Sequence, residues 1–107
     1  MTTTPAPSPD SGHFTLLVRF DLPDEAAAAE FDRLAAETIP VIREREPGTL
    51  TYVPYQVADA PLARVFFEVY RDAAAHADHE QQPHTAAFLT AVRAIVTGIR
   101  VERLTAA

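Results

Sequence analysis

Four stretches of the chain alternate apolar and polar residues or are rich in β-branched and aromatic residues, and both patterns predict β-strands. In the first stretch every second residue from Phe14 to Phe20 is apolar, and the residues between them include Thr15 and Arg19. The predicted strands cover residues 13–21, 50–58, 62–71 and 99–104.

A helix in two pieces is predicted between the last two strands. Asp72 is a favourable N-cap for residues 73–80, and Pro83 is suited to the first turn of a second piece over residues 83–96. Gly98 then suits the position just past the end of that piece.

A longer helix is predicted between the first two strands, because residues 23–25 (Pro-Asp-Glu) are typical of a helix start. Pro40 should kink this helix or start a new turn. The element order β-α-β-β-α-β predicts an α+β fold of the ferredoxin-like type, in which an antiparallel sheet has its helices on one face. The second strand then lies at an edge of the sheet, which agrees with Pro54, a residue without an N–H for a neighbouring strand.

The composition is that of one ordered domain and excludes some kinds of chemistry. Of the 107 residues, 48% are hydrophobic and 22% are charged, which is typical of a soluble domain. Residues 1–12 are mostly Thr, Pro, Ser and small residues and are predicted to form a flexible tail, so the folded domain covers residues 13–107. The chain has no cysteine and no lysine, which excludes disulfides, thiol chemistry and Schiff-base catalysis.

Charge and hydropathy limit the partners and the compartment. The net charge of −6 argues against nucleic acid, whose binding requires clustered cations. No apolar run approaches the roughly 20 residues that a membrane span needs, so no membrane partner is expected. The start of the sequence lacks the basic and apolar parts of a signal peptide, and we therefore expect a cytoplasmic protein.

Both faces of the predicted sheet carry apolar side chains. In the third strand, Val65 and Phe67 point to one face, and Phe66 and Tyr70 point to the other. The helices can cover only one face, and a contiguous apolar surface on a small protein is normally covered by something. We therefore expect a homodimer with twofold symmetry.

Three segments follow one another at characteristic spacings: EPGTLTY (46–52), FFEVYRD (66–72) and HADHEQQPHTAAF (76–88). In order and spacing they resemble the antibiotic biosynthesis monooxygenase-like family of small dimeric α+β barrel proteins. The family pattern is Glu-Pro-Gly, a Tyr on the next strand, an aromatic-x-Glu-x-aromatic strand, two His and a Phe. The residues at these positions are Glu46, Pro47, Gly48, Tyr52, Glu68, Tyr70, His79, His84 and Phe88.

The resemblance implies a homodimer whose two sheets pack face to face, with a pocket in each subunit between the sheet and the helices. It also implies an enzyme that oxidises an aromatic, anthrone- or quinol-like molecule with O₂ and uses no flavin, haem or metal. Other relatives isomerise small signalling molecules or degrade haem, and many have no known activity. An isomerase or other proton-transfer enzyme and a non-catalytic ligand-binding dimer therefore remain as alternatives. Thr49 stands where the family often has Cys, and the missing Trp makes haem degradation the least favoured activity.

The histidines are the candidate acid–base groups. Deprotonation of a phenolic or anthrone substrate needs a base that titrates near neutrality, and His is the natural choice. The family pattern places His79 at the mouth of the pocket as the base. His84 is the second candidate, because the dipole at a helix N-terminus disfavours its protonated form. Both could instead hold the helical pieces to the sheet. His76 is expected at the surface, and the spacing with Asp78 or Glu80 matches no compact zinc motif, so no metal site is predicted.

Glu68 and four further residues complete the candidate site. An acid in mid-strand among apolar neighbours must be paired, protonated or directed into a wet cavity. Glu68 therefore either forms a salt bridge with Arg19 or Arg100 on a neighbouring strand, or is a pocket carboxylate that organises the site. The residues expected to bind the substrate are Tyr52, Tyr70, Phe88 and Arg93.

Overall fold

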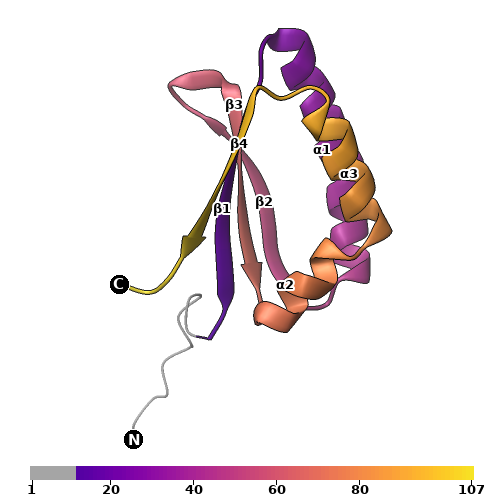
Figure 1. Cartoon of the computed structure of the whole chain (residues 1–107), viewed down its shortest axis with the longest axis vertical. Coiled ribbons are helices and arrows are strands. Elements are labelled where there is room, and N and C mark those ends of the chain that lie inside the picture. The colour runs from indigo at the N-terminus through magenta and orange to yellow at the C-terminus, as the bar shows by residue number, and fades with distance from the viewer. Residues whose placement is uncertain (1–11) are drawn as a thin grey trace, which may run out of the picture.

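The structure is a computed structural model that describes residues 12–107. The flexible tail predicted for residues 1–12 thus lies outside the described residues, apart from Gly12. Strands and helices follow one another along the chain as Figure 1 shows, in the order β1 (Phe14–Asp21), α1 (Glu25–Arg45), β2 (Thr49–Val57), β3 (Ala60–Tyr70), α2 (Ala73–Glu80), α3 (Pro83–Arg93) and β4 (Gly98–Leu104).

The four strands form one antiparallel sheet in the order β2-β3-β1-β4. The helices lie over the same face of this sheet, and no helix of the described chain covers the other face (Figure 1). The predicted α+β ferredoxin-like fold is confirmed. β2 lies at the edge beyond β3, where a residue without an N–H, such as Pro54, is tolerated. Among residues 12–107 no helix is both long enough and apolar enough to cross a membrane.

Two aspartates cap the helices that follow strands. The side chain of Asp24 accepts the backbone N–H of Ala27, and that of Asp72 accepts the N–H of Ala75, each at 2.8 Å. These bonds satisfy N–H groups that have no partner within the helix. α1 then continues as one element past Pro40. Its buried residues are Ala28, Phe31, Ala35, Ile39 and Ile42, which recur at helical spacing.

α3 is shorter than its sequence predicts. The helix ends at Arg93 rather than at residue 96, and Gly98 is the first residue of β4 rather than a cap of the helix. The predicted end was wrong because the chain must leave the helix to reach the sheet. The N–H of Thr97 donates to the carbonyl of Asp21 at 2.8 Å, and this bond joins the connecting segment to the end of β1.

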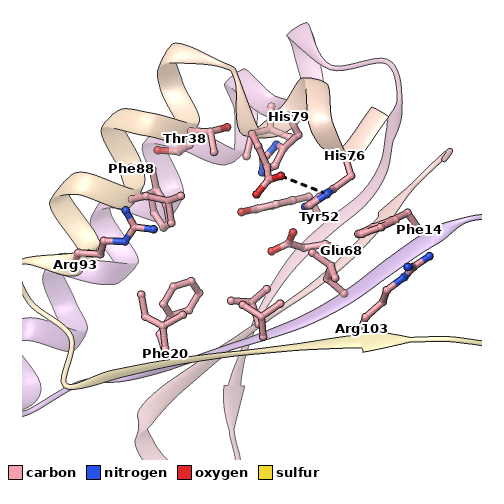
Figure 2. A pocket seen from close by; sticks show the side chains of 18 residues that line it. Phe14, Phe20, Thr38, Tyr52, Glu68, His76, His79, Phe88, Arg93 and Arg103 are labelled. Carbon is pink, nitrogen blue, oxygen red and sulfur yellow. Dashed lines mark ion pairs between the residues drawn. The ribbon is translucent and has the colours of Figure 1, made fainter. Parts of the chain in front are cut away.

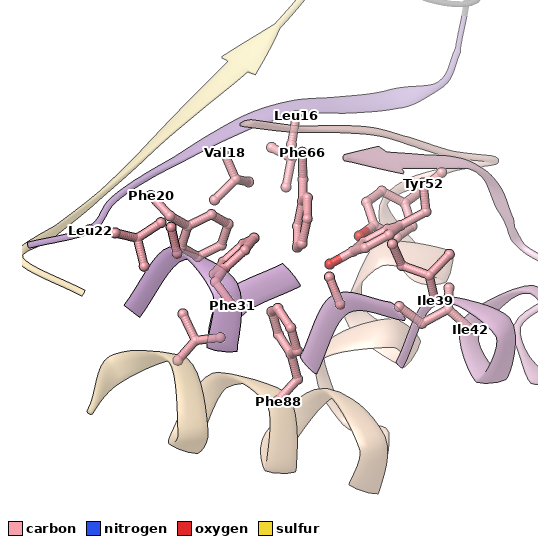
Figure 3. Close-up of a cluster of buried hydrophobic side chains, with 14 of the residues drawn as sticks. Leu16, Val18, Phe20, Leu22, Phe31, Ile39, Ile42, Tyr52, Phe66 and Phe88 are labelled. Atoms are coloured by element: carbon pink, nitrogen blue, oxygen red, sulfur yellow. The ribbon is translucent and has the colours of Figure 1, made fainter. Parts of the chain in front are cut away.

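Four phenylalanines join the helices to the sheet (Figure 3). Phe31 of α1 is fully buried, and its ring centroid lies 5.0 Å from that of Phe20, 5.4 Å from that of Phe66 and 5.9 Å from that of Phe88. The rings come from β1, α1, β3 and α3, so one cluster fixes two helices on two central strands. Tilted and edge-on contacts at these distances are the favourable geometries for aromatic pairs.

Gly48, in the turn between α1 and β2, lets α2 approach the sheet closely. A Cβ at this position would lie 2.7 Å from Cβ of Ala75, and no real pair of side chains comes so close. The Gly48 carbonyl accepts the N–H of Arg71 at 2.8 Å, so the turn has little freedom to move away. The glycine is therefore needed because of the space it leaves to α2, the helix that carries His76 and His79.

The contact between Gly48 and Ala75 can be tested by a double substitution. Gly48→Ala should lower the free energy of unfolding by about 1–3 kcal/mol, the usual cost of overpacking. Ala75→Gly should cost about 1 kcal/mol, because glycine is unfavourable in a helix. The double variant should be less destabilised than the sum of the two, since Ala75→Gly removes the atom that clashes. Urea unfolding of the four proteins measures the coupling, and additive effects would contradict the close approach.

Candidate active site

A cavity of about 350 Å³ lies between the sheet and the helices (Figure 2). Its volume is within the usual range of roughly 300–1,000 Å³ for small-molecule sites. The wall formed by β1 is apolar and includes Leu16, Val18 and Phe20. α3 contributes Phe88 and Leu89. The location between sheet and helices is the one that the resemblance implied.

Behind the wall of this cavity, one buried carboxylate binds two imidazoles. Glu46 is 3% exposed. One of its oxygens lies 2.6 Å from Nδ1 of His79 and accepts the hydroxyl of Thr49 at 2.7 Å. Its other oxygen bonds to Nε2 of His84. His79, His84 and Thr49 each donate a hydrogen bond to Glu46, because an ionised carboxylate can only accept.

This cluster forms where the C-terminal ends of α1 and α2 meet the N-terminal end of α3. Glu46 is the C-cap of α1, His79 lies in the last turn of α2, and His84 lies in the first turn of α3. The Pro47-Gly48 turn follows Glu46 directly and gives α2 the room to approach. The two imidazoles therefore reach the same carboxylate from opposite sides of the break between α2 and α3.

Glu46 is held in its ionised form. Burial by itself raises the pKa of a carboxyl group, but the hydrogen bonds from His84, Thr49 and His79 outweigh it and lower the pKa of Glu46 below its ordinary value. A carboxylate offers no hydrogen, so the nitrogen of His79 that faces it, Nδ1, must present an N–H. The other ring nitrogen, Nε2, then carries no hydrogen and can accept a proton, and His79 is one of the residues that line the cavity.

Glu68 is a second buried carboxyl in the site, with a different environment. It lines the cavity, is 4% exposed and accepts the hydroxyl of Tyr70 at 2.5 Å. Burial raises the pKa of Glu68 to about 7, although the Tyr70 hydrogen bond lowers it, and the charges of Glu46 and Glu80 raise it further. Near neutral pH this group can therefore both donate and accept a proton.

The predicted salt bridge of Glu68 with Arg19 or Arg100 was wrong. Glu68 pairs with Leu16 across β1 and β3, so its side chain points to the helices, and Arg19 lies on the opposite face. Arg19 instead pairs with Asp21 and Arg100 with Glu102. The alternative position, in the wall of the cavity, is the one that the structure has.

Tyr52 presents its hydroxyl to the cavity. The residue is 8% exposed and lines the cavity, and residues 12–107 offer its hydroxyl no hydrogen bond. In Figure 2 the hydroxyl points into the cavity. Burial, followed by the charges of Glu68 and Glu46, raises the pKa of Tyr52 well above its ordinary value, so the phenol keeps its proton. A protonated phenol in this position can donate a hydrogen bond to a ligand or to water in the cavity.

The remaining predicted residues divide into two groups. Phe88 and Arg93 line the cavity, and Figure 2 shows both side chains reaching it from α3. Tyr70 and His84 do not line it, because the hydroxyl of Tyr70 is bound to Glu68 and the ring of His84 is bound to Glu46.

His76 is not the surface residue that the sequence predicted. It lines the cavity, and its ring stacks on that of Phe14 with centroids 4.4 Å apart. The reason is helical geometry, since residues three apart lie on the same side of α2 and His79 faces the cavity. Among residues 12–107, no three His, Asp or Glu side chains are grouped so that they would hold a metal ion.

Glu46 was recognised as part of a pattern but not as a functional residue. One signal was present in the sequence. Glu46 follows two basic residues, Arg43 and Arg45, at the end of a helix, where the dipole favours cations and disfavours an acid. An acid in that position needs a specific partner, which here is a pair of imidazoles.

A family model described as antibiotic biosynthesis monooxygenase matches residues 13–91. Sequence comparison with curated proteins gave no significant match. Among solved structures, SnoaB from Streptomyces nogalater, a cofactor-independent oxygenase solved as a point mutant, is 26% identical over 89% of this chain and 93% of its own, with a TM-score of 0.75. Rv0793 from Mycobacterium tuberculosis is 27% identical over 89% and 95%, with a TM-score of 0.79. PA3566 from Pseudomonas aeruginosa shares the fold at 22% identity, over 92% and 97%, with a TM-score of 0.79.

Glu46→Gln should destabilise the protein at neutral pH and make it less sensitive to acid. The amide keeps the shape but loses the charge that two imidazoles and a hydroxyl bind, so we expect a loss of about 2 kcal/mol in the free energy of unfolding. The pKa of Glu46 is lower in the folded chain than its ordinary value of 4.5, so its contribution is complete above that pH and is lost as the pH falls through the folded value. Urea unfolding over a series of acidic pH values measures both effects.

Glu37→Gln is the matched control. Glu37 lies on the same helix but is exposed and pairs only with Arg33. Its substitution should change the free energy of unfolding by no more than about 0.5 kcal/mol. Equal stability and equal acid sensitivity of the two variants would contradict the role of the Glu46 cluster.

Proposed function

The chain belongs to the antibiotic biosynthesis monooxygenase family, and on this premise we propose that it oxidises an aromatic, anthrone- or quinol-like small molecule with O₂ and without flavin, haem or metal. The observation that carries this proposal is His79 in the wall of a largely apolar cavity, paired with the buried carboxylate of Glu46 behind it. The cofactor-independent oxygenase from Streptomyces nogalater, at 26% identity, supports the same chemistry.

His79 is the base in this proposal. Its Nε2 takes a proton from the CH₂ carbon that lies opposite the carbonyl in the central ring of an anthrone-like substrate, and the carboxylate of Glu46 stabilises the imidazolium that forms. The low polarity of the cavity favours a delocalised carbanion over a hydrated one. His84 acts indirectly, because it holds the second oxygen of Glu46 and so keeps the carboxylate in place.

The oxidation balances without an external reductant. The carbanion passes one electron to O₂, and the two radicals combine to a peroxide on carbon that takes the proton back from His79. His79 then removes the second proton from the same carbon as the O–O bond breaks, and the departing hydroxide becomes water. The CH₂ group and O₂ have then become C=O and H₂O, with four electrons transferred to the two oxygen atoms.

The other cavity residues orient the substrate. The hydroxyl of Tyr52, which has no partner among residues 12–107, donates to the carbonyl or phenolate oxygen on which charge develops. Arg93 supports the same anion from α3, and Phe88 packs on the aromatic rings. Tyr70 acts through Glu68, whose carboxyl it orients by its hydrogen bond.

A second candidate function follows from the position of Glu68. Two proton-transferring groups, Glu68 on the sheet and His79 on a helix, line one cavity, and the pKa of Glu68 is about 7. A keto–enol isomerase needs such a pair, one to remove a proton and one to supply it at a different atom. In that reaction O₂ is not consumed.

Oxygen uptake with a panel of anthrones and reduced quinols tests the proposal. His79→Gln should lower the rate by about 10²–10⁴, as expected for loss of a general base. His13→Gln is the control, since His13 precedes β1 and is not among the residues that line the cavity. No uptake above background with any substrate would overturn the oxygenase proposal for that class. Loss of activity on addition of a chelator would show that a metal is needed.

The same samples without oxygen distinguish the alternatives. Exchange of substrate C–H for deuterium in D₂O, followed by NMR, reports proton transfer alone. Exchange that depends on His79 without oxygen uptake in air would favour the isomerase. Binding with neither exchange nor uptake would favour a ligand-binding protein.

We also propose that the working unit is a homodimer joined through the face of the sheet that the helices leave uncovered. Val53, Phe67 and Leu17 lie side by side across β2, β3 and β1 on this face, and Tyr55 is 56% exposed. Burial of this row against its copy would remove it from water. Sedimentation equilibrium should give twice the chain mass of 11.7 kDa, and the mass of one chain would contradict the dimer.

A further inference from the structure

At one end of the cavity, side chains from three elements form a stack (Figure 2). The ring of Phe14 from β1 lies parallel to that of His76 from α2, with an angle of 12° between the planes. The guanidinium carbon of Arg103 from β4 lies 4.3 Å from the centroid of Phe14. The three residues line the cavity, so the stack forms part of its wall.

Arg103 has no carboxylate partner within residues 12–107, although most arginines there have one. Arg19, Arg33, Arg64, Arg71 and Arg100 each lie close to an acidic side chain. The contact of Arg103 with the face of Phe14 uses none of its N–H donors. A guanidinium held in this way still offers a pair of parallel donors, which fit a carboxylate.

β4 continues the site from Arg103 along one line of side chains. Ile99, Val101 and Arg103 alternate with residues of the other face, and each of them lines the cavity. Ile99 is 39% exposed and Val101 is 58% exposed, so both are apolar surface without cover. Side chains two apart on a strand are separated by about 6.6 Å. An aromatic body that covers Val101 therefore has Arg103 within reach of an acid group at its end.

The acids of the cavity favour one orientation of such a molecule, and Arg93 on α3 is a second cation that lines the cavity. Glu46 is ionised behind His79, Glu68 titrates near neutrality, and Glu80 lies 3.6 Å from His76. An anion close to these three acids would be repelled. Beside Arg103, on the β4 side of the stack, it would meet a cation instead.

We propose that Arg103, held against the ring of Phe14, forms a subsite for the carboxylate of an aromatic acid whose ring system lies along Val101 and Ile99. This assignment rests on the proposed function to the extent that the cavity holds the substrate. It names the substrate class as aromatic carboxylic acids and places the reacting ring toward Tyr52 and His79.

Binding of naphthalene-2-carboxylate and of naphthalene-2-carboxamide to the full chain tests the subsite. The two probes have the same shape and differ in charge, and isothermal titration calorimetry gives both dissociation constants. Wild-type protein should prefer the carboxylate by about tenfold or more, as expected for a charge-assisted pair. Arg103→Gln should remove this preference and leave the carboxamide affinity unchanged.

Arg100→Gln is the matched control, because Arg100 lies on the same strand, points to the other face and pairs with Glu102. It should keep the preference. Equal loss of affinity for both probes in Arg103→Gln would mean that the stack only shapes the cavity, and would overturn the proposal. So would a wild-type protein without preference, or a preference that Arg93→Gln removes and Arg103→Gln does not.

The binding readout separates this inference from the proposed reaction. If the protein prefers the carboxylate through Arg103 but takes up no O₂ with any substrate, the subsite proposal stands and the oxygenase proposal fails. If the protein takes up O₂ but shows no preference between the probes, the oxygenase proposal stands and the subsite proposal fails. Thermal unfolding of each variant shows whether it is folded. Arg103→Gln should leave the unfolding temperature nearly unchanged, because Arg103 is exposed.

Discussion

A single ionised carboxylate determines where the helices meet, and the cavity depends on it. α2 has only eight residues, too few for a helix to be stable on its own. Its position over the sheet therefore comes from tertiary contacts, above all the bond between His79 and Glu46 and the close approach that Gly48 permits. The contact that holds α2 in place thus also sets the direction in which His79 presents its second nitrogen.

The two buried carboxyls of the site have opposite properties because their donors differ. Glu46 accepts hydrogen bonds from three side chains, which lower its pKa, whereas Glu68 accepts one and is otherwise among apolar atoms, which raise its pKa to about 7. Neither forms an ion pair with an arginine, so a structural salt bridge does not explain either of them. Carboxyls whose environments drive their pKa values apart are characteristic of sites that use one as a fixed charge and the other for proton transfer.

The sequence predicted those features of the fold that depend on the residues of a single segment, such as its secondary structure. Alternation and helix-start residues predicted the elements, their order β-α-β-β-α-β predicted the fold and the edge position of β2, and the missing N–H of Pro54 agreed with that position. The end of α3 depends on a bond from Thr97 to Asp21, far away in the sequence. The burial of Glu68 was recognised, but its partner was not, because the face of the sheet to which Arg19 points depends on register.

The role of Glu46 could not be read from its neighbours either, since its imidazoles lie 33 and 38 positions later in the chain. The helix dipole makes an acid such as Glu46 unfavourable at a helix C-terminus, but it does not indicate which residues bind that acid. His76 was assigned to the surface, although its spacing from His79 places both on one side of a helix. Hydrogen bonds between residues at the ends of different helices therefore cannot be predicted from the hydrophobic periodicity of the sequence.

The two halves of the cavity differ in what a substitution would cost. The half formed by helices includes His79, which is buried and bonded to Glu46 behind the wall, so substitutions of either residue should also lower the stability of the fold. The half formed by β4 is at the edge of the sheet, and Ile99 and Val101 are exposed, so changes there cost roughly 0.5 kcal/mol or less. Substitutions at β4 should therefore alter the proposed substrate subsite and leave the Glu46 and His79 pair intact. In the proposed function, substrate selection and proton transfer would be separable, because β4 and the helices form different walls of one cavity.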